Sequence, residues 1–437
     1  MENLEVHSRF DPVATAAPMI EEQKVAGKIR VAIVFMRFGP YHQARLNAAG
    51  RRMELFGVEA CGMENTYAWE KAEGADSFTR ITLTDRHAGN RQWKREVYRE
   101  MRRTLNNTKP DAVVIPGWAS TEALSALAWC AETRTPVVMM SESTEWDERR
   151  IGWKEWIKRR LVGMCSTALA GGTPHASYLE QLGIERKKIF LGYDAVDNDY
   201  FAIKAAEARN RKSEIRNQLG LPENFFLASA RFVEKKNLPR LIQAYARYRD
   251  LVKKSETENK KSEIWDLVLL GDGPLRETLN FQLSTLNLRP HVLLSGFKQY
   301  DELPAYYGLA SAFVHASTTE QWGLVVNEAM ASGLPVLVSN RCGCSADLVR
   351  EGRNGFTFDP CNVERLAELM VKISDARFSL SSFGMEGQLI IKNWGTERFA
   401  LGLKQAVDYA VATGPKSASF FDRLILAFVG WRQLPYE

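Results

Sequence analysis

Two patterns of apolar and polar positions alternate along the chain from Ile29 onward. Short runs that are apolar on both faces predict buried strands of parallel sheets. Stretches with helical spacing and a polar face, such as residues 121–130, separate these runs. The predicted strands are residues 31–36, 112–115, 137–140, 168–170, 225–230, 266–270, 292–295, 312–315 and 335–338. This alternation predicts an α/β fold with doubly wound parallel sheets.

The same pattern divides the chain into four parts. Residues 1–27 show no sustained periodicity, so we expect a loose N-terminal tail. Residues 28–197 and 198–393 predict two Rossmann-like domains of similar size, each long enough to bury its own core. Residues 394–437 are helical in pattern. Two such domains usually bind a ligand in the cleft between them, beyond the carboxyl ends of the strands.

Composition restricts the class of protein. Of the 437 residues, 45% are hydrophobic and 25% are charged, which excludes disordered and fibrous proteins. Six cysteines are too few for a disulfide scaffold, and Cys342 and Cys344 lack the second pair that a structural zinc site needs. No segment approaches the roughly 20 apolar residues that span a bilayer. Reduced thiols favour a cytoplasmic protein, and the net charge of +5 is too small to indicate nucleic-acid binding.

The strongest chemical signal lies between Glu320 and Glu328, which are eight residues apart around Gly323 and the start of an apolar helix. Gly323 permits a close approach of backbone, and the free amides at a helix start bind anions such as phosphate. Each glutamate can accept hydrogen bonds from hydroxyl groups. The arrangement suits a ligand with phosphates in the middle and a sugar ring at either end. A capped core helix with two incidental glutamates would show the same pattern.

A second signal is the pair Arg231 and Lys236, which follow the first predicted strand of the second half. They lie at the carboxyl end of that strand, where α/β sheets bind anions. The planar fork of Arg and the point charge of Lys can together neutralise a diphosphate. A solvated basic loop remains the alternative for this pair.

Together with the stretches between them, these segments resemble the family-four retaining glycosyltransferases of the GT-B fold, the glycosyl transferases group 1. The resemblance covers about residues 225–360 and rests on six motifs in the same order and spacing. The motifs are Arg231…Lys236, Leu270-Gly271-Asp272-Gly273-Pro274, Leu294-Ser295-Gly296-Phe297, the segment 320–328, Ala331-Ser332-Gly333-Leu334-Pro335-Val336 and Gly352-Arg353-Asn354-Gly355-Phe356. It implies two Rossmann-like domains that face each other across a cleft.

The resemblance also implies a role for each residue of the phosphate site. Arg231 and Lys236 would hold the donor diphosphate, and backbone amides around Gly323, Leu324 and Val325 would complete the phosphate cradle. Departure of a nucleoside diphosphate builds negative charge on its phosphate. Two fixed cations and helix-start amides stabilise that charge more in the transition state than in the ground state. We therefore expect neither a metal nor a cofactor beside the donor substrate.

The sugar and nucleoside ends of the donor are assigned by the same resemblance. Glu320 would contact the transferred sugar, and Glu328 would contact the ribose hydroxyls. Main chain near Phe297 and Lys298 would border the nucleobase. Asp197 begins an Asp-x-Asp that looks like a metal site, but the family has a connector there. We therefore expect a structural role for Asp197, and for Phe201 after it.

The first half departs from the family pattern. The turn after the first strand, residues 37–42, offers only Gly39 for close approach to the donor phosphate. Glu142 stands where many members carry a histidine near the reacting sugar. Its carboxylate can steady positive charge or orient an acceptor hydroxyl, but it cannot donate a hydrogen bond as an imidazole N–H does. We expect core or strand-end contacts, and no catalytic role, for His42 and His315.

Two basic clusters in the first half point to the acceptor. One spans residues 91–103, and the other spans residues 149–160, where Arg150, Lys154 and Lys158 oppose Trp153 and Trp156. A basic amphipathic helix with tryptophan is typical of contact with anionic lipid or an anionic acceptor. An ordinary surface helix is the alternative. Residues 394–437 resemble the family's C-terminal helices, so we expect them to pack on the first domain, with the apolar stretch 420–431 buried.

The sequence thus predicts a retaining, metal-independent hexosyltransferase. We expect it to move a sugar from a nucleotide diphosphate sugar, a UDP-sugar by preference, to a lipid-linked or glycan acceptor in cell-surface polysaccharide or glycolipid synthesis. The expected location is the cytoplasm, with peripheral contact to the inner membrane face. The alternatives are a UDP-sugar epimerase or phosphorylase on the same architecture, a non-catalytic partner subunit, and a basic nucleic-acid-binding protein.

Overall fold

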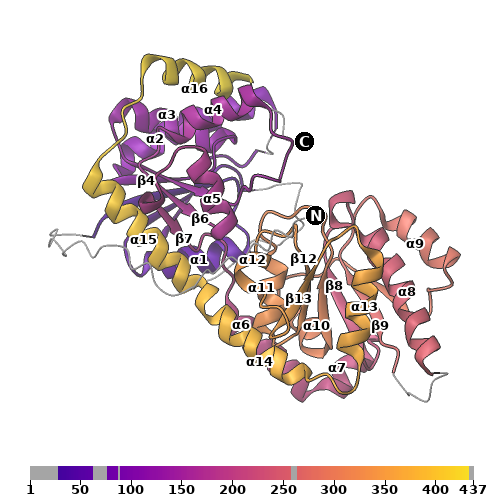
Figure 1. Ribbon diagram of the computed structural model, residues 1–437. Helices are drawn as coiled ribbons and strands as arrows, with labels where there is room; N and C mark the ends of the chain where they lie inside the picture. The colour runs from indigo at the N-terminus through magenta and orange to yellow at the C-terminus, as the bar shows by residue number, and fades with distance from the viewer. Residues whose placement is uncertain (1–27, 63–75, 87–88, 257–262, 433–437) are drawn as a thin grey trace, which may run out of the picture.

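The computed structural model describes residues 28–62, 76–86, 89–256 and 263–432. The predicted tail 1–27 lies outside the described residues. The described chain forms two domains, each built on a parallel sheet with helices on both faces (Figure 1). The predicted doubly wound α/β fold is confirmed.

The described part of the first domain contains a seven-stranded sheet in the order β3-β2-β1-β4-β5-β6-β7. Its strands are β1 (Arg30–Phe35), β2 (Glu54–Glu59), β3 (Thr79–Thr82), β4 (Ala112–Pro116), β5 (Val137–Ser141), β6 (Thr167–Ala170) and β7 (Ile189–Leu191). Its helices are α1 (Pro40–Gly50), α2 (Arg91–Thr108), α3 (Thr121–Thr133), α4 (Gly152–Val162) and α5 (Thr173–Gln181). In register, β1 pairs Arg30 with Glu54 of β2 and Val31 with Ala112 of β4. The strand order reverses between β1 and β4.

The described part of the second domain contains a six-stranded sheet in the order β10-β9-β8-β11-β12-β13. Its strands are β8 (Phe225–Ser229), β9 (Asp266–Leu270), β10 (Val292–Gly296), β11 (Ala312–His315), β12 (Val336–Ser339) and β13 (Gly355–Phe358). Its helices are α6 (Asn198–Asn210), α7 (Lys212–Leu219), α8 (Leu238–Glu256), α9 (Arg276–Thr285), α10 (Leu303–Leu309), α11 (Leu324–Ala331), α12 (Ser345–Leu348), α13 (Val363–Ser374) and α14 (Leu380–Ile391). This order reverses between β8 and β11.

Loops at the carboxyl ends of the two sheets meet each other. Tyr41, just after β1, donates a hydrogen bond from its hydroxyl to Glu328, which follows β11. Thr173, just after β6, donates its backbone N–H to Asp347 Oδ2 (2.8 Å) and its hydroxyl to Oδ1 (2.5 Å). Asp347 follows β12. The edges of the two sheets that bind ligands in this fold class therefore face one another.

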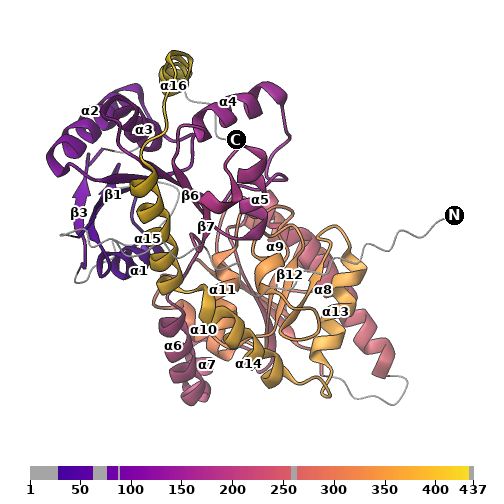
Figure 2. The same cartoon turned by 60° about the vertical axis from the view of Figure 1, so that its left-hand side comes forward.

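After the second domain the chain returns to the first. The connector before α6 and the start of the return lie side by side, bridged between Val196 and Gly395. Helix α15 (Thr396–Thr413) packs on α1, β6 and β7, and α16 (Phe420–Arg432) packs on α3 and α4 (Figure 2). The expectation that 420–431 is buried holds for one side of α16 only. Leu426 and Val429 are buried, whereas the opposite side carries exposed apolar residues, namely Phe420, Phe421, Leu424 and Phe428.

Helix α4 lacks the basic face that the sequence predicts. The Lys158 side chain is buried, and its ammonium donates to the Tyr178 hydroxyl (3.3 Å). Arg150 also turns inward, because it donates to the same hydroxyl (2.8 Å) and lies 4.3 Å above the centroid of that ring. Trp153 and Trp156 are exposed instead. The prediction is wrong because Tyr178 offers these cations a hydroxyl and an aromatic face, and because Glu155 offers a carboxylate, which lies 3.0 Å from Lys158 Nζ and 3.4 Å from Arg150 Nη1.

No helix within the described ranges combines the length and apolar character that a bilayer crossing requires. This agrees with the absence of a long apolar segment in the sequence.

Close packing of α15 on the first sheet yields a stability prediction. A Cβ added at Gly402 would lie 2.4 Å from the Leu191 carbonyl oxygen, so Gly402→Ala must push α15 away from β7. We expect a loss of about 1–3 kcal/mol in the free energy of unfolding, the usual cost of overpacking. Denaturant unfolding measures it. Gly152→Ala in α4 is the matched control, since nothing lies within 4 Å of a Cβ there. Equal stability of the two variants would contradict the prediction.

Candidate active site

A partly buried ion pair joins the two strongest sequence signals. Lys236, in the short turn 234–236 after β8, donates from Nζ to Glu320 Oε2, which lies in the loop after β11. His315 Nε2 lies 3.2 Å from the same oxygen, and Ser317 Oγ lies 3.3 Å from it. Burial alone would raise the pKa of Glu320, but Lys236 and His315 outweigh burial and hold this pKa well below its usual range. Glu320 is therefore ionised at neutral pH.

His315 has the buried strand-end position that was expected, and it also contacts the candidate site. It ends β11 and is buried, as the sequence analysis expects, but its ring lies against the Glu320 carboxylate and the Ser317 hydroxyl (3.2 Å). His315 therefore positions a residue of the candidate site. The sequence could have indicated this contact, because His315 ends a predicted strand only five residues before Glu320.

Arg231 lies in the same loop as Lys236, and the turn after β9 supports that loop. Ala230 donates its N–H to the Leu270 carbonyl (3.0 Å). Gly271 has φ +124°, and a Cβ there would lie 1.9 Å from the Ala230 carbonyl oxygen. Only glycine allows this contact. The Gly-Asp-Gly turn thus fixes the backbone on which Arg231 stands at the carboxyl end of β8.

Gly323 and the start of α11 lie beside this ion pair in sequence and in space. Gly323 has φ +100°, and a Cβ there would lie 2.7 Å from Cys342 Sγ. Both the backbone angle and the lack of space require glycine. Leu324 and Val325 begin α11, and N–H groups of a first turn have no acceptor within the helix. This is the position that the predicted anion-binding amides require, and their role stays a prediction.

Glu328 is fully buried and is held by two tyrosines. Tyr307 donates its hydroxyl to Oε2 (2.6 Å), and Tyr41 of the first domain donates to Oε1. Burial raises the pKa of Glu328 to about 7, although the two phenolic hydrogen bonds lower it. Sequence reasoning missed Tyr41. It stands two residues after Gly39, and only the facing of the two domains brings it to Glu328.

The other residues predicted to contact the nucleotide sugar, Gly39, Phe297 and Lys298, lie in less constrained positions. Gly39 precedes α1 and donates its N–H to His42 Nδ1 (3.1 Å), but its φ of −111° is open to any residue. Buried His42 has the core role expected, since burial lowers its pKa to about 3. Phe297 is partly exposed after β10, the edge strand. Beside it, Lys298 Nζ lies 3.5 Å from Glu302 Oε1.

Glu142 belongs to a carboxyl pair on the first domain's side of the site. Burial, followed by the charge of Asp194, raises the pKa of Glu142 well above its usual range, and Glu320 adds to this rise. Asp194 lies 3.8 Å from Arg45 Nη2, while its buried Oδ2 has no other donor. Burial beside a second carboxyl favours the protonated form of Glu142. In that form its carboxyl group can donate a hydrogen bond, which the sequence analysis does not anticipate.

Asp197 and Phe201 have structural positions. Asp197 accepts a hydrogen bond from the Tyr200 N–H (3.0 Å) and caps α6, and Phe201 is fully buried. The described ranges hold no group of three or more His, Cys, Asp or Glu side chains arranged for a metal ion. The expectation that no metal takes part stays a prediction.

The raised pKa of Glu328 predicts a pH-dependent stability. Between its ordinary pKa, about 4.5, and its folded value of about 7, the folded chain keeps a proton that the unfolded chain has lost. The free energy of unfolding should therefore fall as pH rises through this window. Glu328→Gln lacks this titrating group. The free energy of unfolding of Glu328→Gln minus that of wild type should therefore rise by on the order of 3 kcal/mol between pH 4.5 and pH values above 7. Denaturant unfolding from pH 4.5 to 8 measures the gain.

Glu277→Gln, an exposed glutamate of α9, is the control for this experiment. A stability difference between wild type and Glu328→Gln that does not change with pH would contradict the prediction.

Comparison with known proteins agrees with this geometry. Residues 211–387 match the family described as glycosyl transferases group 1. An alpha-monoglucosyldiacylglycerol synthase of Acholeplasma laidlawii is 25% identical over 199 residues, 45% of this chain and 47% of that protein. The sulfoquinovosyl transferase SQD2 of Arabidopsis thaliana is 40% identical over 101 residues, 22% of this chain and 19% of that protein. The chain thus spans less than half the length of these relatives.

Solved structures extend the likeness to both domains. The crystal structure of Anabaena HepE in complex with UDP and glucose superposes with a TM-score of 0.64 at 18% identity, over 87% of this chain and 99% of that one. Likeness at this identity shows the fold. The predicted GT-B architecture is confirmed. The chain has the GT-B fold, and residues 211–387 of its second domain match the family of glycosyl transferases group 1.

Proposed function

We propose that the protein is a retaining glycosyltransferase that uses a nucleotide diphosphate sugar, a UDP-sugar by preference. The observation that carries the proposal is the Lys236–Glu320 ion pair beside Gly323 and the start of α11. A cation, an ionised carboxylate and free backbone amides thus converge at the facing edges of the two sheets. Phosphate and sugar hydroxyls need these three kinds of partner.

The charges of the site suit departure of a diphosphate. Lys236 and Arg231 stand on one loop, so both can neutralise charge that builds on the leaving phosphate. Donor binding brings that phosphate next to Lys236, whose present partner is Glu320. Glu320 stays ionised and can accept hydrogen bonds from hydroxyls of the transferred sugar. These contacts strengthen as the sugar–phosphate bond breaks, which is the condition for catalysis.

In our proposal, Glu142 is an uncharged hydrogen-bond donor on the opposite side of the reacting sugar from Glu320. Its proton, held by burial and by Asp194, gives it a hydrogen-bond donor at neutral pH. This is the property that histidine supplies in many proteins that the sequence resembles. In our proposal Glu142 orients the sugar or the incoming hydroxyl and remains uncharged.

Binding of the donor ribose needs a rearrangement at Glu328. In the described structure Tyr41 and Tyr307 occupy its two oxygens. Tyr307 belongs to the second domain, whereas Tyr41 belongs to the first. Separation of the domains therefore frees one oxygen of Glu328 for a ribose hydroxyl. We assign the arrangement in which Tyr41 and Tyr307 both bind Glu328 to a closed form of the two domains that holds no nucleotide sugar.

We propose a lipid-linked or glycan acceptor for the first domain. The name of the Acholeplasma relative states a glucosyl diacylglycerol, and other relatives are named phosphatidylinositol monomannoside mannosyltransferases. These names state a diacylglycerol or a phosphatidylinositol, so each relative is named for a lipid-linked sugar. Peripheral contact with the cytoplasmic membrane face follows for this chain if its acceptor is of the same class.

Removal of either fixed cation tests the phosphate site. Arg231→Ala and Lys236→Ala should each lose about 2–4 kcal/mol of transition-state stabilisation, which lowers kcat/KM by about 30- to 1,000-fold. The measurement is release of UDP from a UDP-sugar in the presence of acceptor. Lys235→Ala, an exposed neighbour in the same turn, is the control. Wild-type turnover in both site variants would show that Arg231 and Lys236 do not stabilise the leaving phosphate.

The anomeric configuration of the product, measured by NMR, tests whether the transfer retains configuration.

Metal removal tests the charge assignment. If Lys236, Arg231 and the α11 amides carry the phosphate charge, dialysis against EDTA should leave kcat within about twofold, because protein groups supply the stabilisation. The measurement is the same UDP-release assay with and without added Mg²⁺ or Mn²⁺. Strict dependence on either ion would show that the fixed cations are insufficient.

A further inference from the structure

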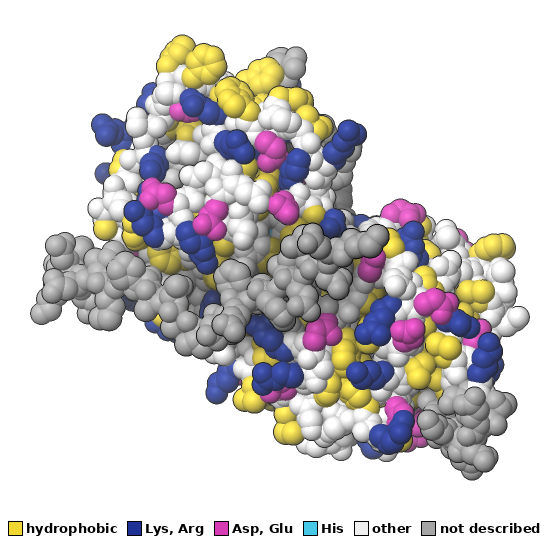
Figure 3. All heavy atoms as spheres, in the orientation of Figure 1, with side chains coloured by type: hydrophobic (Ala, Val, Ile, Leu, Met, Phe, Trp, Pro, Cys, Tyr) yellow, Lys and Arg dark blue, Asp and Glu magenta, His cyan; other side chains and the backbone are white. Residues whose placement is uncertain are grey.

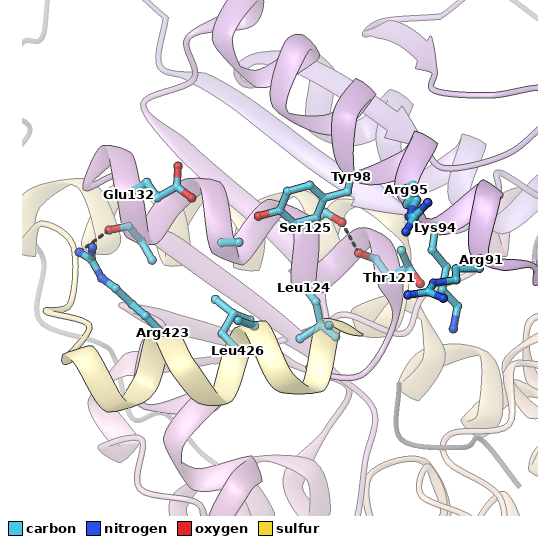
Figure 4. A pocket seen from close by; sticks show the side chains of 14 residues that line it. Arg91, Lys94, Arg95, Tyr98, Thr121, Leu124, Ser125, Glu132, Arg423 and Leu426 are labelled. Carbon is cyan, nitrogen blue, oxygen red and sulfur yellow. Dashed lines mark hydrogen bonds between the residues drawn. The ribbon is translucent and has the colours of Figure 1, made fainter. Parts of the chain in front are cut away.

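A cavity of about 460 Å³ lies on the outer side of the first domain, between α2, α3 and α16 (Figure 4). Its floor is apolar and includes Leu124, Ala128 and Leu426. Its rim at one end carries three cations of α2, namely Arg91, Lys94 and Arg95. The cavity is thus built with a charged end and an apolar body, and its volume is typical of a ligand site.

The three cations at the rim have no acidic partner in the described part of the chain. Further along the same helix, Arg102 pairs with Glu132 (2.7 Å) and Arg99 pairs with Glu100 (2.9 Å). The unpaired cluster also stands at the N-terminal end of α2, where the helix dipole disfavours positive charge. Nothing within the described fold compensates this arrangement, and an external anion would.

Apolar side chains next to the cavity face outward. On α16, Phe421, Leu424 and Phe428 are 60%, 49% and 51% exposed and repeat at helical spacing. On α4, which packs against α16, Trp153 and Trp156 are 56% and 49% exposed. Figure 3 shows apolar side chains gathered at the end of the first domain. We call the three α16 residues the outer stripe.

Aromatic and aliphatic residues in this arrangement are unusual on a protein surface in water. Exposed apolar patches of this kind mark contact with a partner or a membrane. A helix that lies in a membrane interface has an apolar face with aromatic residues and basic residues near it. The outer stripe and the three cations at the cavity rim supply both parts on one end of the domain.

We propose that this end of the first domain lies on an anionic membrane and that the cavity between α2, α3 and α16 receives one phospholipid from it. The phosphate would bind Arg91, Lys94 and Arg95, and an acyl chain would cover Leu124 and Leu426. The outer stripe would enter the interfacial layer. Free phosphate would leave the apolar floor uncovered, and a neutral lipid would leave the cations unpaired.

This site goes beyond the proposed donor chemistry, because it lies between α2, α3 and α16, none of which carries a residue of the candidate active site. It needs no sugar donor, so lipid binding can be measured without any assay of glycosyl transfer. A failure of the lipid proposal would leave the donor chemistry untouched, and a failure of the donor chemistry would leave the lipid binding intact.

Sedimentation with vesicles of phosphatidylglycerol or of phosphatidylcholine tests the surface. Wild type should bind phosphatidylglycerol vesicles more tightly. Each basic residue near an anionic surface strengthens binding about fivefold, so Lys94→Glu/Arg95→Glu should weaken binding at least about 20-fold. Phe421→Ser/Phe428→Ser should weaken it at least about tenfold, since two aromatic side chains leave the interface.

Two matched controls should bind as wild type does. Lys212→Glu/Lys253→Glu makes the same charge change on the second domain, and Phe281→Ser changes a 73% exposed side chain of α9. Equal vesicle binding by the site variants and wild type would overturn the proposal, and so would wild type that binds neither vesicle. A dimer that dissociates in Phe421→Ser/Phe428→Ser, without vesicle binding, would assign the stripe to a second copy and also overturn it.

Native mass spectrometry with dioleoylphosphatidylglycerol tests the cavity itself. Wild type should retain one lipid, and dioleoylphosphatidylcholine should not replace it. Ala427→Trp, on the cavity side of α16, fills the space with an indole and should abolish retention while circular dichroism stays unchanged. Ala128→Phe does the same from α3. Retention of one lipid by both variants would overturn the cavity assignment.

Discussion

The arrangement of the site depends on one partly buried ion pair, between Lys236 and Glu320. The two residues lie 84 positions apart, on loops that leave neighbouring strands β8 and β11 at the point where the sheet order reverses. Because removal of one partner would leave the other charge largely shielded from water and unpaired, the pair fixes both loops together. Gly323, the start of α11 and the Gly-Asp-Gly turn at Gly271 are placed relative to it. A nucleotide sugar that binds here must replace the contact between Lys236 and Glu320 with contacts of its own.

Much of this second domain could be predicted from sequence because its signals are local. Each predicted strand occurs within one or two residues of its expected place, and the segment from Glu320 to Glu328 contains its own glycine and helix start. The pattern missed β2, β3, β7 and β13. Strands β3, β7 and β13 have only three or four residues, and β2 begins and ends with a glutamate. They gain their pairing from a neighbour in the sheet, and a single strand's sequence does not contain that information.

The rest of the site depends on contacts between distant segments. Tyr41 reaches Glu328 only because two sheets face each other. The pKa of Glu142 is raised by burial and then by the charge of Asp194, which lies 52 residues later in the sequence. The inward turn of Lys158 likewise depends on Tyr178, which belongs to the next helix. In each case the residue type was visible in the sequence, but its burial and partner came from tertiary packing. Charge alone therefore gave the wrong face for α4.

The return of the chain has a consequence for the order of folding during synthesis. Phe399, Leu403 and Val407 of α15 share a buried cluster with Val31 and Ile33 of β1, the first described strand. The core of the first domain thus remains incomplete until α15 has been synthesised, after the whole second domain. A nascent chain would hold the first sheet with one face uncovered while the second domain is made. The side chains of β1 are therefore covered from water only after a long stretch of later sequence has left the ribosome.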